Sequence, residues 1–231
     1  MVRIKVCGIT NITDAVNIAN LKIDALGFIL SKSPRKIELS KVAQISKALP
    51  PFISRVAVVV DITLNELEEI QNSKLFDYIQ FHGSEDISLI EKCTLKTIKA
   101  IKIENEKSIS DVAIYQDFVD YLLFDTKVRN QIGGTGETFE WSILKKANIK
   151  KPFILAGGIG PENISQAINI LKPAAIDLNS KVEKSPGKKD INLIKQTLEI
   201  IKDTEKLIWI LMGSRAEAPV SLGISTKQSK T

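Results

Sequence analysis

The sequence predicts one α/β domain, a (β/α)8 barrel of eight parallel strands and their helices. Its 231 residues match the usual size of such a barrel. Short apolar runs rich in Val, Ile, Leu and Phe alternate with longer amphipathic stretches. This alternation repeats eight times and begins at residue 2. An open, doubly wound sheet would show the same periodicity, so closure of the sheet is an expectation at this point.

The expected strands are the short apolar runs between turn signals. They comprise residues 2–7, 24–30, 53–60, 76–81, 95–101, 120–125, 152–157 and 174–178. A helical pattern follows each strand, and in six of these patterns the apolar positions clearly recur at intervals of three and four residues. The six helices comprise residues 13–21, 39–49, 64–73, 141–147, 163–171 and 191–201.

The segment from residue 205 to residue 231 does not continue the repeat, so we treat it as an extension of a barrel domain at residues 1–204. It opens with the apolar run LIWILMG at residues 207–213, which is shorter than the roughly 20 apolar residues that cross a membrane. The run could form an extra strand or an interface segment. We expect roughly the last 18 residues to be disordered, because they are polar and have no period.

Composition and charge narrow the classes of function. The net charge of +5 is modest, and the 32 basic and 27 acidic residues are interspersed, which favours a small anionic substrate over a nucleic acid. With two cysteines and one histidine, the chain lacks the spacings of a zinc site. The amino terminus opens directly with a strand pattern and has no secretory signal. We therefore expect a cytoplasmic protein with no metal and no membrane partner.

Reactive residues are expected where strands end, because the carboxyl ends of all eight strands meet on one face of a barrel. Cys7 ends the first strand, and a nearby helix start and basic neighbours would lower the pKa of its thiol from about 8.5. It is then a base or a nucleophile, or else a small packing residue. Asp125 and Asp177 lie in apolar strands, where a carboxylate is costly unless it is paired or functional. Either could be a general acid or could cap a turn.

Two further side chains belong near the expected barrel mouth. Arg35 lies in the loop after the second strand, and its planar fork suits a carboxylate. Its position alone nevertheless favours an ordinary solvated arginine. His82 is the only histidine and could act as an acid or a base. Its position before Gly83 also suits a loop hydrogen bond, and we favour that role.

Two glycine-rich loops follow the sixth and seventh strands, at residues 130–139 and 155–164. Gly157 and Gly158 in the second loop would let backbone amides approach an anion closely. Pro161 is a suitable first residue for the next helix. The alternative is that the loops are flexible hinges, one of which could close over a site.

The residues after the eighth strand add to this anion site. Ser180 and Glu183 have the spacing of a capping box, which predicts a short extra helix just after Asn179. A phosphate held between the loops after strands seven and eight, at the start of an added helix, is the usual anion site of phosphate-binding barrels. The sequence therefore predicts a phosphate site there.

Motifs along residues 2–203 also share their order with a known family. They are KVCGIT, DALGF with SPR, QFHG, LLFDT, GGTGETFEW, LAGGIGPENI, and AIDLNSKVE with SPGKKD. In these motifs the sequence resembles phosphoribosylanthranilate isomerases. The resemblance implies an Amadori rearrangement in tryptophan biosynthesis that needs no cofactor. It implies that Asp125 is the acid that opens the ribose ring and that Cys7 is the base that removes the proton from C2.

The same resemblance implies the substrate contacts. Arg35 would hold the anthranilate carboxylate, and Asp177 would help orient the substrate from the opposite wall. The backbone amides that would bind the phosphate belong to Gly157, Gly158, Asn179 and Ser180. This assignment separates the roles of the two aspartates, which the residues alone leave open.

The sequence departs from the family at two positions. Glu137 stands where the family often has lysine, and Lys181 where it often has glycine. The first change puts the phosphate contact of the loop after strand six in doubt, and the second would add a positive charge beside the phosphate. Rival hypotheses are another phosphate-binding barrel that acts on a related sugar phosphate, and a noncatalytic ligand-binding or RNA-binding barrel. The chain is expected to be a monomer or a homodimer.

Overall fold

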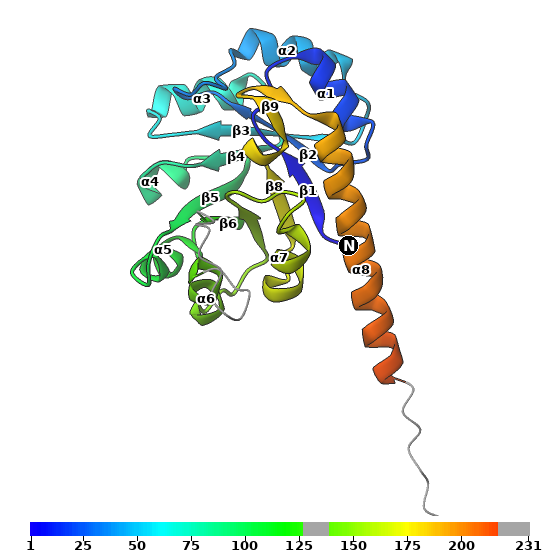
Figure 1. Ribbon diagram of the computed structural model, residues 1–231. Helices are drawn as coiled ribbons and strands as arrows, with labels where there is room; N and C mark the ends of the chain where they lie inside the picture. The colour runs from blue at the N-terminus through cyan, green and yellow to red at the C-terminus, as the bar shows by residue number, and fades with distance from the viewer. Residues whose placement is uncertain (127–138, 217–231) are drawn as a thin grey trace, which may run out of the picture.

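The computed structural model describes residues 1–126 and 139–216, and its central feature is a closed barrel of eight parallel strands (Figure 1). Each strand pairs with the next one along the chain, and β1 pairs with β8 to close the ring. The strands are β1 Arg3–Val6, β2 Ala25–Ile29, β3 Ser54–Val59, β4 Tyr78–Phe81, β5 Lys96–Ile103, β6 Tyr121–Thr126, β7 Phe153–Ala156 and β8 Ala175–Leu178. Closure confirms the predicted (β/α)8 TIM barrel and excludes the open sheet.

Helices surround the barrel (Figure 1). They are α1 Ile12–Ala19, α2 Leu39–Ala48, α3 Leu64–Asn72, α4 Ile87–Ile90, α5 Ser108–Tyr115, α6 Phe139–Lys146, α7 Ile164–Leu171 and α8 Ile191–Ala216. Local capping chemistry explains where some of them begin. The Asn11 side chain accepts a hydrogen bond from the Asp14 backbone N–H at 2.8 Å, and Thr63 and Glu66 form a capping box before α3. All six predicted helices are present, and only the last differs much in length.

Strand side chains alternate between the helix layer and the barrel interior. The larger apolar core lies between strands and helices, whereas a smaller cluster forms inside the barrel. The buried members of the interior cluster are Cys7, Val56, Val58, Ile98, Ala100, Leu123, Ile154 and Ala156. Because the period is two, Lys5 faces the interior with Cys7, and Asp125 faces it with Leu123. The alternation thus brings polar side chains to the interior at the carboxyl ends of the strands.

Helix α8 continues through the boundary expected at residue 204. Neither glycine nor proline occurs between residues 191 and 212, so the run LIWILMG extends the helix rather than forming a strand. Thr204 Oγ1 donates to Ser165 Oγ at 3.0 Å, and Glu205 accepts a hydrogen bond from the Val2 backbone N–H. Beyond these contacts the helix projects from the barrel (Figure 1), with Leu207, Trp209, Ile210 and Leu211 exposed. Most of the segment expected to be disordered, residues 217–231, lies outside the described residues.

The chain after β8 differs from the predicted short helix. It forms one 3-10 turn, Ser180–Val182, followed by the strands β9 Glu183–Ser185 and β10 Lys188–Lys189. The capping box is wrong: Asn179, not Ser180, precedes the turn, and the Glu183 carboxylate binds Arg35 and Lys189 instead of reaching back to the turn. Pro161 likewise lies in a turn, and α7 begins three residues later at Ile164.

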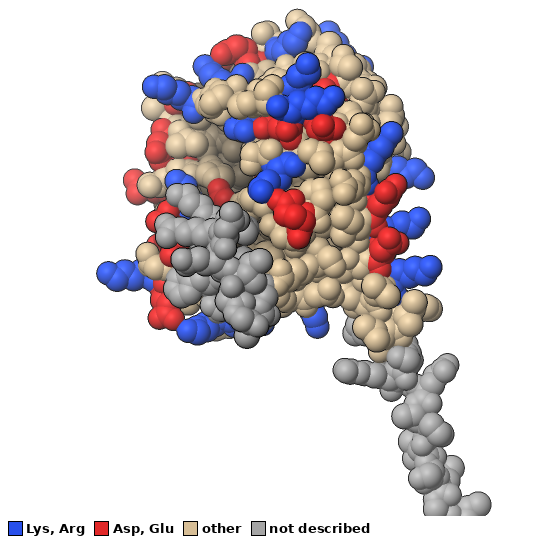
Figure 2. All heavy atoms as spheres, viewed as in Figure 1, with Lys and Arg blue, Asp and Glu red and all other residues tan. Residues whose placement is uncertain are grey.

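The described surface carries charge of both signs. On the face shown in Figure 2, Lys and Arg side chains alternate with Asp and Glu side chains. Among the described residues, no helix combines the length and the apolar character needed to cross a membrane. The same part of the chain contains no group of three or more His, Cys, Asp or Glu side chains arranged to hold a metal ion.

Candidate active site

A cavity of about 360 Å³ opens at the carboxyl ends of the strands. It brings together seven of the eight predicted site residues. Its lining includes Cys7, Asp125, Gly157, Gly158, Asp177, Asn179 and Ser180, and also Lys32, Gln80, His82 and Lys181. The expectation that a thiol and a carboxyl group share one barrel mouth therefore agrees with the geometry.

Cys7 follows β1 and is 4% exposed, with Gly27 of β2 beside it. A methyl group at Gly27 would lie 2.7 Å from Cys7 Sγ and 3.0 Å from Lys5 Cε, so glycine makes room for both side chains. Burial raises the pKa of the Cys7 thiol, and Lys5 and Lys189 oppose this only in part. The expected lowering of the thiol pKa is wrong, because the loss of solvent outweighs the nearby positive charge.

Lys5 and Asp177 form a buried ion pair beside Cys7. Their Cα atoms are direct partners in the pairing of β1 with β8, and Lys5 Nζ lies 2.7 Å from Asp177 Oδ2. Burial lowers the pKa of Lys5, but Asp177 and Cys7 together raise it by more. The net shift is therefore upward, and the amine stays charged. Asp177 Oδ1 is buried and has no hydrogen-bond partner among the described residues. Because Asp177 also lines the cavity, this oxygen is a vacant acceptor for a ligand donor.

Asp125 lies near the carboxyl end of β6, and His82 follows the end of β4. His82 Nε2 lies 3.2 Å from Asp125 Oδ2, and His82 Nδ1 lies 3.0 Å from Gln80 Nε2. The ring therefore bonds two side chains and lines the cavity. The loop hydrogen bond that we favoured for this ring is wrong, because its two nitrogens face Asp125 and Gln80. The His82 backbone N–H donates to Val59 O at 2.8 Å.

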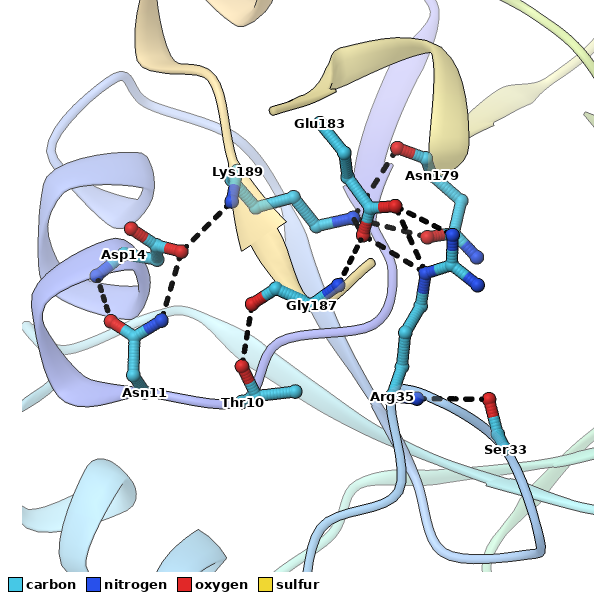
Figure 3. Close-up of polar contacts among 9 residues, drawn as sticks. All are labelled: Thr10, Asn11, Asp14, Ser33, Arg35, Asn179, Glu183, Gly187 and Lys189. Carbon is cyan, nitrogen blue, oxygen red and sulfur yellow. Dashed lines mark hydrogen bonds and ion pairs between the residues drawn. The ribbon is translucent and has the colours of Figure 1, made fainter. Parts of the chain in front are cut away.

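Arg35 is held by Glu183 in the fork geometry that guanidinium and carboxylate groups favour (Figure 3). Arg35 Nε and Nη2 lie 2.9 Å and 2.6 Å from the Glu183 oxygens. Burial raises the pKa of Glu183, but hydrogen bonds from Arg35 and Lys189 outweigh it and lower the pKa overall. Arg35 is not among the residues that line the cavity. Its Nη1 is the guanidinium nitrogen that Glu183 leaves uncommitted.

Lys189 connects the Arg35–Glu183 pair to the loop after β8 through hydrogen bonds. Lys189 Nζ donates to Asn179 Oδ1 at 3.0 Å and to Glu183 Oε1 at 2.8 Å (Figure 3). Lys189 thus fixes the Asn179 side chain through its oxygen. This network holds the hairpin of β9 and β10 against the loops that follow β2 and β8.

Two lysines add positive charge at the end of the cavity where we predicted the phosphate. Lys32 and Lys181 line the cavity together with Gly158 and Ser180. Lys181 Nζ lies 2.6 Å from Glu162 Oε1, and both side chains are about half exposed. Asn163 braces the loop after β7, because its amide donates to Gly158 O at 2.9 Å. Glu137 and most of the glycine-rich loop at residues 130–139 lie outside the described residues.

Comparison with known proteins assigns this chain to a family. The family model described as N-(5'phosphoribosyl)anthranilate (PRA) isomerase matches residues 4–200. The chain belongs to the PRA isomerase family. A Petrotoga mobilis protein named N-(5'-phosphoribosyl)anthranilate isomerase is 67% identical over 201 residues, which cover 87% of this chain and 97% of the relative. The chain is accordingly an isomerase, as the sequence predicted.

Solved PRA isomerases share the fold. The crystal structure of the Thermotoga maritima protein has a TM-score of 0.77 and 36% sequence identity, and the match covers 88% of this chain and all of that one. A second structure contains reduced 1-(o-carboxyphenylamino)-1-deoxyribulose 5-phosphate, and its TM-score is 0.76 at 35% identity, with coverage of 88% and 100%. That PRA isomerase binds a phosphorylated sugar derivative that carries a carboxyphenyl group.

Sequence reasoning missed four polar residues in or beside the candidate site of this PRA isomerase: Lys5, Gln80, Lys32 and Lys189. Lys5 was detectable, since it lies two positions before Cys7 in one strand and so shares its face. The same period relates Gln80 to His82. The positions of Lys32 and Lys189, in contrast, depend on loops whose path the sequence does not specify.

Proposed function

We propose that this chain catalyses the Amadori rearrangement of N-(5'-phosphoribosyl)anthranilate to 1-(2-carboxyphenylamino)-1-deoxyribulose 5-phosphate in tryptophan biosynthesis. One observation carries the proposal: a thiol and a carboxyl group, Cys7 and Asp125, line the same cavity in a barrel of the PRA isomerase family. Such an isomerisation needs one acid and one base and no net oxidation.

Asp125 is the general acid in this mechanism. Its carboxyl proton passes to the ribose ring oxygen while the C1–O bond breaks, which leaves an open chain with an iminium ion between C1 and the anthranilate nitrogen. The side chain is about a third exposed, so it can reach a ligand in the cavity. Its bond to His82 holds one oxygen, Oδ2, and leaves Oδ1 to carry the proton.

Cys7 is the general base. The thiolate removes the proton from C2, and the C2–H electron pair forms a C1=C2 double bond as the iminium becomes an enamine. Return of a proton to C1 and loss of the hydroxyl proton at C2 then give the ketone. Burial opposes thiolate formation, whereas the ammonium groups of Lys5 and Lys189 favour it. The positively charged iminium group of the substrate, next to the sulfur, would favour the thiolate further.

The other polar groups would hold the substrate. Asp177 Oδ1, a buried acceptor that makes no hydrogen bond to the described residues, suits a ribose hydroxyl. Arg35 Nη1 would donate to the anthranilate carboxylate while Glu183 keeps the rest of the guanidinium in place. The phosphate would lie on the backbone amides of Gly157, Gly158, Asn179 and Ser180. We expect no cofactor, because the iminium ion itself acidifies the C2 proton.

The test is turnover of freshly generated N-(5'-phosphoribosyl)anthranilate by the purified chain, followed as loss of substrate fluorescence. We expect Asp125→Asn to lower kcat by about 100-fold or more, since the amide has no proton of suitable acidity to give. Asp117→Asn is the matched control, because Asp117 is exposed in the turn after α5 and does not line the cavity. A wild-type chain that binds the compound without consuming it would support the noncatalytic alternative instead.

A further inference from the structure

Five polar side chains form an unbroken chain of hydrogen bonds across the cavity. The chain starts beside Cys7, where Lys5 Nζ lies 2.7 Å from Asp177 Oδ2 and 3.0 Å from Gln80 Oε1. It continues from Gln80 Nε2 to His82 Nδ1 at 3.0 Å, and ends where His82 Nε2 meets Asp125 Oδ2 at 3.2 Å. The chain therefore connects the residue beside the proposed base to the proposed acid.

The chemistry of Lys5 fixes the direction of every bond in this chain. A charged lysine amine only donates, so the amide group of Gln80 must turn its oxygen toward Lys5. The amide nitrogen then points at His82 Nδ1, and because that nitrogen donates, Nδ1 must accept. An imidazole nitrogen that accepts carries no proton. The ring proton of neutral His82 is therefore on Nε2, where it is donated to Asp125 Oδ2.

Burial enforces this arrangement. Lys5 is 4% exposed and Gln80 is 1% exposed, so neither side chain can exchange its partners for bulk water. If the Gln80 amide turned over, its NH2 group would face the ammonium group and its oxygen would face the lone pair of Nδ1. Both hydrogen bonds would be lost inside the barrel, which is strongly unfavourable.

We propose that Gln80 and His82 are positioning residues for Asp125: Gln80, oriented by Lys5, holds His82 as the Nε2–H tautomer, and His82 fixes the carboxyl group of Asp125. The proposal rests on the proposed function, in which Asp125 is the acid. Because Oδ2 accepts from His82, the transferable proton lies on Oδ1. His82 thus decides which of the two carboxyl oxygens delivers the proton, and it holds that oxygen in one orientation.

The single histidine makes the tautomer directly measurable. In untagged protein labelled with 15N-histidine, the two ring nitrogens of His82 give the only imidazole signals. In mildly alkaline buffer without ligand, we expect a protonated Nε2 and an unprotonated Nδ1 in the wild-type chain. A proton on Nδ1 of the neutral ring in the wild type would overturn the proposal.

Gln80→Glu is the deciding variant, because an Nε2–H ring is also common in unconstrained histidine. A glutamate at this position has nearly the same shape, but it can only accept, so it would draw a proton onto Nδ1. We expect the Nδ1 signal to change to that of a protonated nitrogen, and kcat to fall about tenfold or more. An unchanged Nδ1 signal in a folded variant would show that Gln80 does not set the tautomer.

Kinetics separate positioning from a merely structural role. We expect His82→Leu to lower kcat by about 10-fold to 100-fold with KM changed less than about threefold, because a misoriented acid slows the chemical step without removing a substrate contact. His82→Gln keeps an N–H donor near the position of Nε2 and should recover most of the loss. If the leucine variant turns over within about twofold of wild type, or if glutamine is no better than leucine, the role assigned to His82 is wrong.

Two controls keep these outcomes distinct from misfolding and from failure of the proposed function. Gln116 is also buried but lies outside the cavity, so Gln116→Leu measures the effect of replacing a buried glutamine amide, and its kcat should stay near wild type. Thermal unfolding of each variant shows whether the barrel is intact. An inactive wild-type chain with the Nε2–H tautomer and the expected Gln80→Glu response would overturn the proposed function and leave the tautomer assignment standing.

Discussion

Lys5 and Asp177 are paired across the seam where the first and last strands close the barrel. Their Cα atoms are in register, their side-chain atoms lie 2.7 Å apart, and both side chains are almost completely buried. The pair places an ammonium group against the Cys7 side chain, and in the part of the chain that the structure describes it leaves one oxygen of Asp177 without a partner. The strand pairing that closes the barrel therefore also brings together the two residues that set the electrostatics beside the proposed base.

Removal of the Lys5 charge should make the Cys7 thiolate harder to form. Burial already raises the thiol pKa, and Lys5 is the strongest opposing group. In Lys5→Met we therefore expect the ultraviolet titration of the thiolate, and the alkaline-rising limb of kcat/KM, to move to higher pH. Measurements in a Cys93→Ser background report on Cys7 alone, because the chain has two cysteines.

The same variant should lose about 3–5 kcal/mol of unfolding free energy, since Asp177 would remain buried without its partner. Lys195→Met, at an exposed position of α8, serves as the control for both measurements. A thiol titration that does not move in folded Lys5→Met would contradict the assigned effect of the ammonium group.

The two cysteines should differ sharply in their importance for turnover. Cys7→Ser replaces the thiol by a hydroxyl group that is a far poorer proton acceptor near neutral pH, so kcat should fall by about 100-fold or more. Cys93 follows α4, outside the cavity, and burial raises its pKa to about 11. Cys93→Ser should therefore turn over within about twofold of wild type. Similar losses in both variants would argue against Cys7 as the base.

Glu183 should stabilise the fold in a pH-dependent way. Its carboxylate accepts hydrogen bonds from Arg35, Lys189 and the Gly187 backbone N–H, and these lower its pKa from 4.5 in spite of burial. A lowered folded-state pKa contributes stability above the unfolded-state value, and that contribution disappears as the pH falls through the folded-state value. Near neutral pH, Glu183→Gln should lose about 3 kcal/mol of unfolding free energy, because two cations lose their partner.

Urea unfolding at a series of pH values checks this expectation. The difference between wild type and Glu183→Gln should be largest near neutrality and should shrink in acid. Glu199→Gln, at an exposed position of α8, should show little difference at any pH. A Glu183→Gln difference that stays constant down to strongly acidic pH would show that the lost stability does not come from the charged form.

Lys181 should strengthen substrate binding through its charge beside the phosphate. It lines the cavity next to Ser180, and its partner Glu162 is about half exposed and easily displaced. We expect Lys181→Ala to raise KM about threefold to tenfold at low ionic strength with kcat nearly unchanged, and the effect to weaken as salt screens the charge. Lys184→Ala, on the exposed side of β9, is the matched control. An equal effect of both substitutions would point to overall charge rather than a contact.

The barrel could be predicted because the pattern that specifies its strands and helices lies in residues that are close together in the sequence. The alternation of short apolar runs with amphipathic stretches follows from burial on both faces of a strand and on one face of a helix. Strand ends could be located to within a few residues, which placed Cys7 and Asp125 at one end of the barrel. The predicted capping box failed because it considered only local spacing. Glu183 has the spacing of a capping residue, but Arg35 and Lys189 bind its carboxylate instead.

By itself, then, the sequence determined the order of the elements, the face on which each strand residue lies, and which strand ends carry reactive groups. Only the tertiary structure decided which side chains meet. Lys5 and Asp177 are 172 positions apart, Arg35 and Glu183 are 148 apart, and His82 and Asp125 are 43 apart. The physical reason is that pKa values, tautomers and vacant acceptors depend on contacts within a few ångströms, and these contacts exist only once the barrel has closed.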